Sequence, residues 1–277
     1  MRTAVVAIAR LEGNYIREFV EHNLSVGFNK VIIADNDWKE DNEDVKEILK
    51  DYIENGFVIY EDWRDKKTNE LGKNVQMYAY SLIYEKYKND FDWFLMVDID
   101  EFLMLENDKN VSDFLGRFPE DCEVITVNWD CKNDSGLVTY DPRPMLERFT
   151  ESIPTNKCVQ YANIPEDAHV KSFVKGGLPF VTWISNPHIP SNQLKVYHAS
   201  GNRCDSSPFH VVDFTNARII HFVSKTINEW CENKLKRGVA DRSYELFLKT
   251  YPNRFWGYNQ VTEEKIQWLR EHGYSGV

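Results

Sequence analysis

Short apolar segments alternate with amphipathic ones along the first hundred residues, and this alternation limits the folds open to the chain. The uninterrupted apolar segments, each of which predicts a buried β-strand, are residues 3–9, 31–34, 57–60 and 93–97. Between them, apolar residues at helical spacing predict helices that end at Gly27 and Gly56 and a third helix over 75–87. Such an order is typical of a mostly parallel sheet covered on both faces, so an α/β fold is expected.

The alternation weakens beyond residue 98. Strands are predicted at 124–129 and 218–223, with turn-rich sequence between them. A capping box of Thr226 and Glu229 predicts a helix that ends at Gly238, and a last helix is predicted to start near Thr262. No repeat or linker interrupts the chain, so one continuous domain with an irregular second half is expected.

The charge of the chain excludes one large class of partners. It has 44 acidic and 33 basic residues and a net charge of −11, whereas nucleic-acid binders draw affinity from excess Lys and Arg. An anionic ligand would need a bound cation or a local basic cluster. No apolar segment reaches the length of a membrane span, and Arg10 and Glu12 interrupt the first one before it could form a signal-peptide core. Five cysteines without a CxxC pair favour the reducing cytoplasm.

Three carboxylates directly follow the apolar segment at 93–97. They are Asp98, Asp100 and Glu101, and the carboxyl end of a strand is where open α/β sheets bind ligands. Because residues i and i+2 of an extended chain point the same way, Asp98 and Asp100 are predicted to converge on one hard cation, Mn²⁺ or Mg²⁺. Such a cation would bridge to a diphosphate.

Basic residues and a histidine gather after residue 217. His221 lies in an apolar strand and is the favoured third metal ligand, with His188 as the alternative. Lys225 precedes a predicted helix, whose free N–H groups favour phosphate. Lys234 and Arg237 share a helix face and either clamp a leaving diphosphate or only contact solvent.

The chain resembles the GT-A glycosyltransferases, in the branch that groups family-2-like bacterial enzymes with glycosyltransferase family 92. The stretches that carry the resemblance are RLEGNYI (10–16), DWFLMVDIDEFL (92–103), HFVSK (221–225) and KLKRG (234–238). The resemblance implies a GT-A type of fold, with a Rossmann-like, mostly parallel sheet flanked by helices. It also implies a single domain, 1–277, with a nucleotide-sugar-binding half at 1–105, an acceptor-side half at 106–240 that completes the metal and diphosphate site, and a C-terminal helical extension at 241–277.

The resemblance also implies roles for individual residues. Ala9, Arg10 and Glu12 would lie beside the nucleotide base, and Asp35 is similar to the acidic residue that contacts uridine. Asp98 would face the ribose or the metal, Asp100 would bind the metal directly, His221 would complete the metal shell, and Lys225 would meet the diphosphate. From its position on the third helix, Gln76 is a further candidate for nucleotide contact.

A general base is harder to identify. Transfer with inversion needs a side chain that takes the proton of the acceptor hydroxyl. Asp134, in a Gly-containing loop, is favoured over Asp130 and Glu147. The Glu-Asp pair that usually opens a helix in family 2 is not evident, which leaves both the base and the stereochemistry open.

The sequence thus predicts a metal-dependent glycosyltransferase that moves a hexose from a UDP-sugar to a hydroxyl of a glycan or lipid-linked glycan. Inversion, galactose as the hexose and a part in surface polysaccharide or lipopolysaccharide assembly are the expectations that follow from the resemblance. The alternatives are a nucleotidyltransferase acting on sugar phosphates, a phosphatase with Asp98 as nucleophile and a non-catalytic sugar-binding module. A cytoplasmic protein is expected, with room for peripheral association at the inner face of a membrane.

Overall fold

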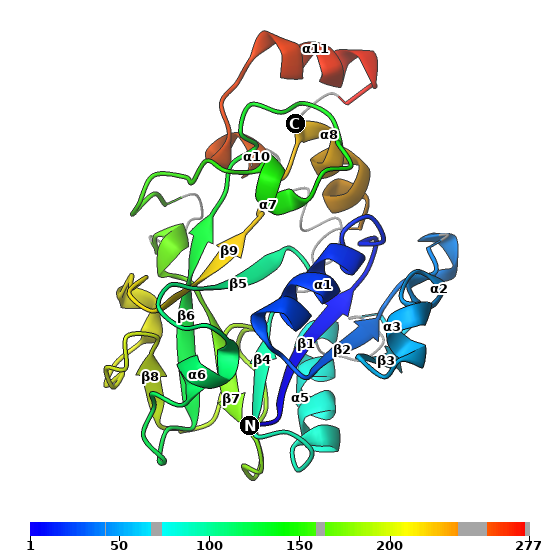
Figure 1. The fold of residues 1–277 in the computed structure, drawn as a ribbon. Helices are drawn as coiled ribbons and strands as arrows, with labels where there is room; N and C mark the ends of the chain where they lie inside the picture. Colours follow the sequence, from blue (N-terminus) through cyan, green and yellow to red (C-terminus); the bar gives the residue numbers. More distant parts are fainter. Residues whose placement is uncertain (42, 68–73, 159–163, 238–253, 275–277) are drawn as a thin grey trace.

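The computed structural model describes residues 1–41, 43–67, 74–158, 164–237 and 254–274 (Figure 1). The elements up to residue 105 are β1 (Thr3–Ala9), α1 (Ile16–Val26), β2 (Lys30–Asp35), the 3₁₀ turn η1 (Lys39–Asp41), α2 (Val45–Ile48), α3 (Lys50–Glu54), β3 (Val58–Asp62), α5 (Val75–Tyr87), β4 (Trp93–Met96) and β5 (Glu101–Leu105). The later ones are α6 (Val111–Leu115), β6 (Val124–Cys131), α7 (Met145–Arg148), η2 (Glu166–Ala168), β7 (Val170–Lys175), β8 (Val196–His198), η3 (Pro208–His210), β9 (Ala217–His221), α8 (Ile227–Glu229), the π-helical η4 (Trp230–Leu235), α10 (Arg254–Tyr258) and α11 (Glu263–Glu271).

One sheet runs through both halves of the described chain. Its strand order is β3-β2-β1-β4-β7-β6-β9-β5, and β8 pairs with β6. The strands β1, β2, β3 and β4 are parallel, as expected, and β6 is parallel to β8 and β9. Antiparallel pairs join β4 to β7, β7 to β6, and β9 to β5. The predicted α/β fold with a mostly parallel sheet is confirmed.

The strands bury side chains on both faces because successive residues point to opposite sides. In β1, Val5 and Ala7 join one core with Phe19 of α1, whereas Ala4 and Val6 join another. The second core includes Tyr80 and Ile83 of α5. Helices α1 and α5 therefore cover opposite faces of the parallel strands (Figure 1). Gly27 ends α1 with φ 103, a left-handed conformation that favours glycine.

A third core joins the C-terminal helices to α8 and η4. Trp230 and Leu235 pack there with Phe255 of α10 and Trp268 of α11. Figure 1 shows α11 at the end of the molecule, with α8 and α10 close to α7. The predicted helix after Thr226 is present as α8 followed by η4, while Gly238 lies outside the described residues. Within the described ranges, no helix combines the length and the apolar character that a bilayer span requires.

Candidate functional site

Residues 98–101 form a turn at the carboxyl ends of the parallel strands. The backbone N–H of Asp98 donates to the Glu101 side chain at 2.9 Å, and the backbone N–H of Glu101 donates to the Asp98 carbonyl at 3.1 Å. Ile99 points into the core and is 1% exposed. Because the chain turns at residues 99 and 100, the alternation of an extended strand does not reach Asp100. The two aspartates accordingly contact different side chains.

Asp98 is held by side chains from β7 and α5. Its Oδ2 accepts a hydrogen bond from Lys171 Nζ at 2.9 Å, and its Oδ1 accepts one from the Gln76 amide. The Tyr80 hydroxyl lies 3.4 Å from the same Oδ1. The Asp98 side chain remains 35% exposed. Of its two expected roles, this position suits a hydrogen bond to a ligand hydroxyl such as that of ribose, because a cation would compete with the lysine.

Lys171, on β7, is a further residue of this site. Its side chain is 0% exposed, and its ammonium also lies 3.2 Å from Glu101 Oε2. Burial opposes the charge, but Asp98 and Glu101 raise the pKa of Lys171 above its usual range. The strand VKSFVK has no apolar run that marks it as buried, yet its residues 170–174 are buried in the structure. Lysine is almost never fully buried unless it is paired.

Basic groups from the second half of the chain surround Asp100. Lys234 Nζ is 3.6 Å and Lys225 Nζ is 3.7 Å from its Oδ2, and His221 Nε2 is 3.8 Å from its Oδ1. Burial opposes ionisation, but Lys225, Lys234 and His221 hold the pKa of Asp100 well below its usual range. These three separations exceed the ordinary hydrogen-bond length, so the groups face one another without being locked together.

The chemistry of Asp100 and His221 fits a divalent cation. Burial lowers the pKa of His221 to about 3, so the imidazole is neutral and can act as a ligand. Two ligands about 2.1 Å from one ion lie roughly 3–4 Å apart, and the 3.8 Å between Nε2 and Oδ1 falls in that range. Among the described residues, no group of three His, Cys, Asp or Glu side chains is placed to hold a metal ion. The two side chains would therefore need ligand oxygens or water to complete the shell.

Glu12 and Arg237 extend the charged cluster toward the first strand. Arg237 donates to the Glu12 carboxylate and to the Arg10 carbonyl, the latter at 2.8 Å. Lys225 Nζ lies 3.8 Å from Glu12 Oε2. Burial lowers the pKa of Lys234 to about 8. Three cations and two carboxylates from distant parts of the sequence thus meet at one place.

The residues predicted to lie beside the nucleotide base are at the ends of β1 and β2. Ala9 is fully buried and pairs with Asp35 in the β1–β2 register. Arg10 turns toward η1, where it bonds Asp41 at 2.8 Å and stacks 3.3 Å from the centre of the Trp38 ring. This arrangement commits the Arg10 guanidinium to protein partners, and it leaves its backbone beside Arg237.

Asp37 is a residue that the sequence analysis did not select. Asp35 is 2% exposed, and its oxygens accept hydrogen bonds from the Tyr60 hydroxyl at 2.6 Å and the Asp37 backbone N–H at 3.0 Å. Asp37 Oδ1 accepts from the Leu11 N–H at 2.8 Å, while its Oδ2 is buried with no hydrogen-bond partner among the described residues. Asp37 is therefore better placed than Asp35 to accept a hydrogen bond from a ligand.

The three candidate bases occupy different environments. Asp134 is 3% exposed and forms an ion pair with Lys265 of α11. Asp130 forms an ion pair with Lys132 at 3.1 Å. The next residue of β6, Cys131, is the strand partner of His221 on β9. Glu147 is exposed on α7.

A Glu-Asp pair begins a short 3₁₀ turn between β6 and β7. Glu166 and Asp167 begin η2, a turn of three residues that is too short to give a helical pattern in the sequence. Glu166 is fully buried and accepts a hydrogen bond from the Tyr258 hydroxyl at 3.0 Å. Asp167 is 6% exposed, and its Oδ1 is buried with no hydrogen-bond partner in the described part of the chain.

Aromatic contacts place η2 near His221. His169, which follows η2, stacks on Trp129 with ring centres 5.1 Å apart. The ring centres of Trp129 and His221 are 4.3 Å apart. His188 also packs on Trp129 and its Nδ1 lies 3.0 Å from the Val170 carbonyl. His221, and not His188, is the histidine in contact with Asp100.

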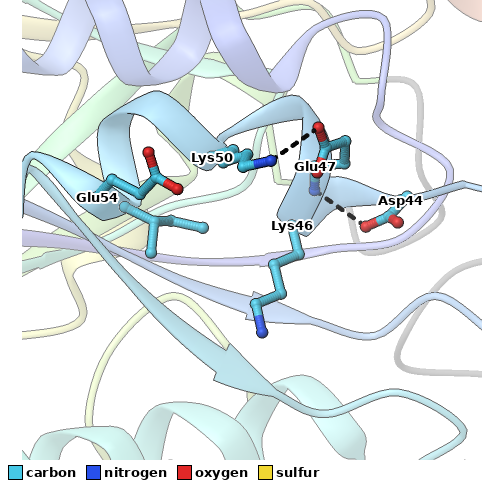
Figure 2. Close-up of a pocket in the computed structure, with 6 residues that line it drawn as sticks. Asp44, Lys46, Glu47, Lys50 and Glu54 are labelled. Atoms are coloured by element: carbon cyan, nitrogen blue, oxygen red, sulfur yellow. Dashed lines mark hydrogen bonds and ion pairs between the residues drawn. The ribbon is translucent and has the colours of Figure 1, made fainter.

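A cavity of about 220 Å³ lies elsewhere, on α2 and α3 (Figure 2). The residues that line it are Asp44, Lys46, Glu47, Lys50, Ile53 and Glu54. Asp44 accepts the Glu47 N–H as the cap of α2, and Lys50 pairs with Glu47 at 3.5 Å. None of the predicted site residues lines this cavity.

Comparisons with known proteins identify the family. The model of glycosyltransferase family 92 matches residues 2–256, and no curated protein gives a significant match. Among solved structures, residues 1–349 of S. aureus TarS match 99% of this chain and 80% of their own at 12% identity and a TM-score of 0.38. The same fragment in complex with UDP matches 97% and 78% at 13% identity and a TM-score of 0.42. A longer TarS chain matches 97% of this chain but only 47% of its own, at 13% identity and a TM-score of 0.43.

Proposed function

We propose that this chain, which belongs to glycosyltransferase family 92, transfers a hexose from a UDP-sugar to a hydroxyl of a glycan or lipid-linked glycan. Family membership makes it a glycosyltransferase and decides against the nucleotidyltransferase, phosphatase and binding-module alternatives. The observation that supports the donor is the meeting of Lys225, Lys234 and Arg237 around Asp100. Their three charges exceed those of Asp100 and Glu12, so the cluster can attract a diphosphate despite the acidity of the whole chain.

Different residues at the carboxyl ends of the strands would bind the uracil ring, the ribose and the diphosphate of the donor. Asp37, beside Leu11, would accept the N–H of the uracil ring, and Asp98 would accept a ribose hydroxyl. Lys225 and Lys234 would contact the diphosphate, with Arg237 held behind them by Glu12. The fixed positions of Asp98 and Arg237 mean that little reorganisation is needed when the donor binds.

Asp100 and His221 would hold Mn²⁺ or Mg²⁺, an ion that offsets the charge of a leaving diphosphate when it is bound. Lys225 and Lys234 add their charge at the same place and so stabilise UDP as it leaves. His221 remains neutral because of its burial, so it does not need to lose a proton before it binds the ion.

Asp167 is the general base of the proposal. Its Oδ1 is buried with no hydrogen-bond partner among the described residues, so this oxygen is available to accept the proton of an acceptor hydroxyl. The side chain of Asn128 on β6 donates to the Asp167 carbonyl at 3.1 Å and so fixes the turn on the sheet. Removal of the acceptor proton opposite the departing UDP leads to inversion. Galactose as the hexose and a part in surface polysaccharide or lipopolysaccharide assembly rest only on the family resemblance.

A thermal-shift screen of nucleotide sugars, with and without Mn²⁺, tests the proposed donor. Ligands that bind only the folded state raise the melting temperature. UDP and UDP-hexoses should give a shift that depends on Mn²⁺ and is lost with EDTA. GDP-sugars serve as the control for nucleotide selectivity. The absence of a shift with every UDP compound would contradict the proposal.

A further inference from the structure

We propose that Tyr15 is a positioning residue for Lys225, whose ammonium it supports with the face of its ring. The ring of Tyr15, at the N-terminus of α1, would set how firmly Lys225 holds the diphosphate. This inference rests on the diphosphate role given to Lys225 in the proposed function. It assigns a part in donor binding to a residue 210 positions away in the sequence, a separation that follows from the numbering.

Lys225 has an unusual backbone conformation. Its φ is 55, in the left-handed region, which is strained for a residue other than glycine. Such a conformation persists only where the surroundings fix it. Thr226, the next residue, caps α8 through a complete capping box with Glu229. The backbone of Lys225 is thus directed by the start of that helix.

Tyr15 is held by side chains of α8 and η4. Its side chain is buried, and its hydroxyl donates to Glu229 Oε1 at 2.8 Å. Asn233 donates to the Tyr15 hydroxyl at 3.2 Å. Glu229 is also held by Arg148, whose two terminal nitrogens approach Oε1 at 3.1 Å. The tyrosine ring is therefore held in a defined orientation by a network that also caps α8.

The Lys225 ammonium lies over this fixed ring. Nζ is 4.4 Å from the ring centre of Tyr15, within the range of a cation–π contact. Its carboxylate neighbours are further away than a hydrogen bond, at 3.7 Å for Asp100 and 3.8 Å for Glu12. The ring face therefore orients the ammonium, while its N–H donors are not consumed by a short ion pair. Burial raises the pKa of Tyr15 far above its usual value, so the phenol stays neutral.

Replacement of the ring by variants of the same shape tests this inference. Tyr15→Phe keeps the ring face and removes only the hydroxyl, so it is the reference from which the effect of the ring face on the Kd for UDP is measured. Trifluorophenylalanine at position 15 fills the same space but has a much weaker negative face. It should weaken UDP binding roughly threefold to tenfold relative to Tyr15→Phe. Calorimetry with UDP and Mn²⁺ gives Kd, and melting curves report folding.

A double-mutant cycle separates positioning from a structural effect. In a Lys225→Met background, which should itself weaken UDP binding, fluorination at position 15 should have no further effect on Kd. Tyr52 is the matched control, because it also lies under a cation, with Arg17 4.9 Å from its ring centre, but on α3. The same ring series there should leave Kd unchanged.

The outcomes distinguish the positioning role of Tyr15 from the diphosphate role of Lys225. Equal Kd values for phenylalanine and its trifluoro form at position 15, with Lys225→Met weakened, would overturn the role of Tyr15 alone. A fluorine effect that persists in Lys225→Met would do the same, because it would act on something other than the ammonium. Full UDP affinity in Lys225→Met would overturn the diphosphate role on which both depend.

Discussion

The Lys171 ammonium lies 2.9 Å from Asp98 Oδ2, although the lysine side chain is completely buried and that of Asp98 is 35% exposed. The same ammonium contacts the buried Glu101, which is the first residue of β5. One side chain of β7 therefore fixes both ends of the turn that carries Asp100. The turn owes its shape to this ion pair as well as to its own sequence.

Lys171→Met should destabilise the protein and weaken donor binding together. It leaves Glu101 buried without its partner, and breaking a buried ion pair in this way costs about 3–5 kcal/mol. Urea unfolding measures that loss, and calorimetry with UDP measures the effect of a mobile Asp98. Lys195→Met is the control, because its pair with Asp121 is about half exposed and should have little effect on unfolding. Equal effects of the two variants would contradict the role given to Lys171.

The free energy of unfolding should fall as the pH rises from about 4 to about 8, because Asp37 keeps its proton to a higher pH in the folded state than in the unfolded chain. Burial raises the pKa of Asp37 to about 7 from 3.8, with help from Asp35, Glu43 and Asp41 and against the hydrogen bond from Leu11. Between these values the folded state keeps a proton that the unfolded chain has released, so the free energy of unfolding falls as pH rises. Asp37→Asn should reduce this slope in urea unfolding at several pH values. A slope identical to that of the wild type would assign it to other groups.

Asp167→Asn should suppress transfer without loss of the donor. Removal of a general base lowers kcat by roughly 10²–10⁴-fold, whereas Kd for UDP should stay the same because the proposed donor contacts do not include Asp167. Asp134→Asn is the companion variant. It leaves Lys265, which is 1% exposed, without its ion-pair partner, so its main effect should be a lower melting temperature. Normal turnover in Asp167→Asn and lost turnover in a folded Asp134→Asn would return the base to Asp134.

Local pattern was enough to predict the parallel half of the sheet. Continuous apolar segments such as Val31–Ala34 are buried on both faces, and this leaves a direct mark on the sequence. The insertion of β7 between β4 and β6 left no such mark, because the pairing of Phe94 with Val174 joins residues that are far apart in the chain. Strand order in the second half depends on these distant contacts.

The same distinction applies to the candidate site. Asp98 and Asp100 stand out because they follow a buried strand, so the motif is local. Lys171 and Tyr15 gain their meaning from partners that only the fold brings near, Asp98 and Lys225. Asp167 was missed for another reason, since a three-residue turn has no periodicity to detect. The metal, the base and the hexose remain predictions.

Calorimetric titration of UDP into the wild type and into Asp100→Asn, with and without Mn²⁺, measures whether Asp100 couples nucleotide binding to the metal ion. Asp141→Asn, which removes one partner of the surface pair with Arg143, is the control for the substitution. We predict that the wild type and the control bind UDP about tenfold or more tightly with Mn²⁺ than without it. Asp100→Asn should remain folded and bind UDP with an affinity that Mn²⁺ does not change. Binding of UDP to Asp100→Asn with the full Mn²⁺ dependence of the wild type would show that Asp100 does not hold the ion, and a wild type that binds no UDP would overturn the proposed donor.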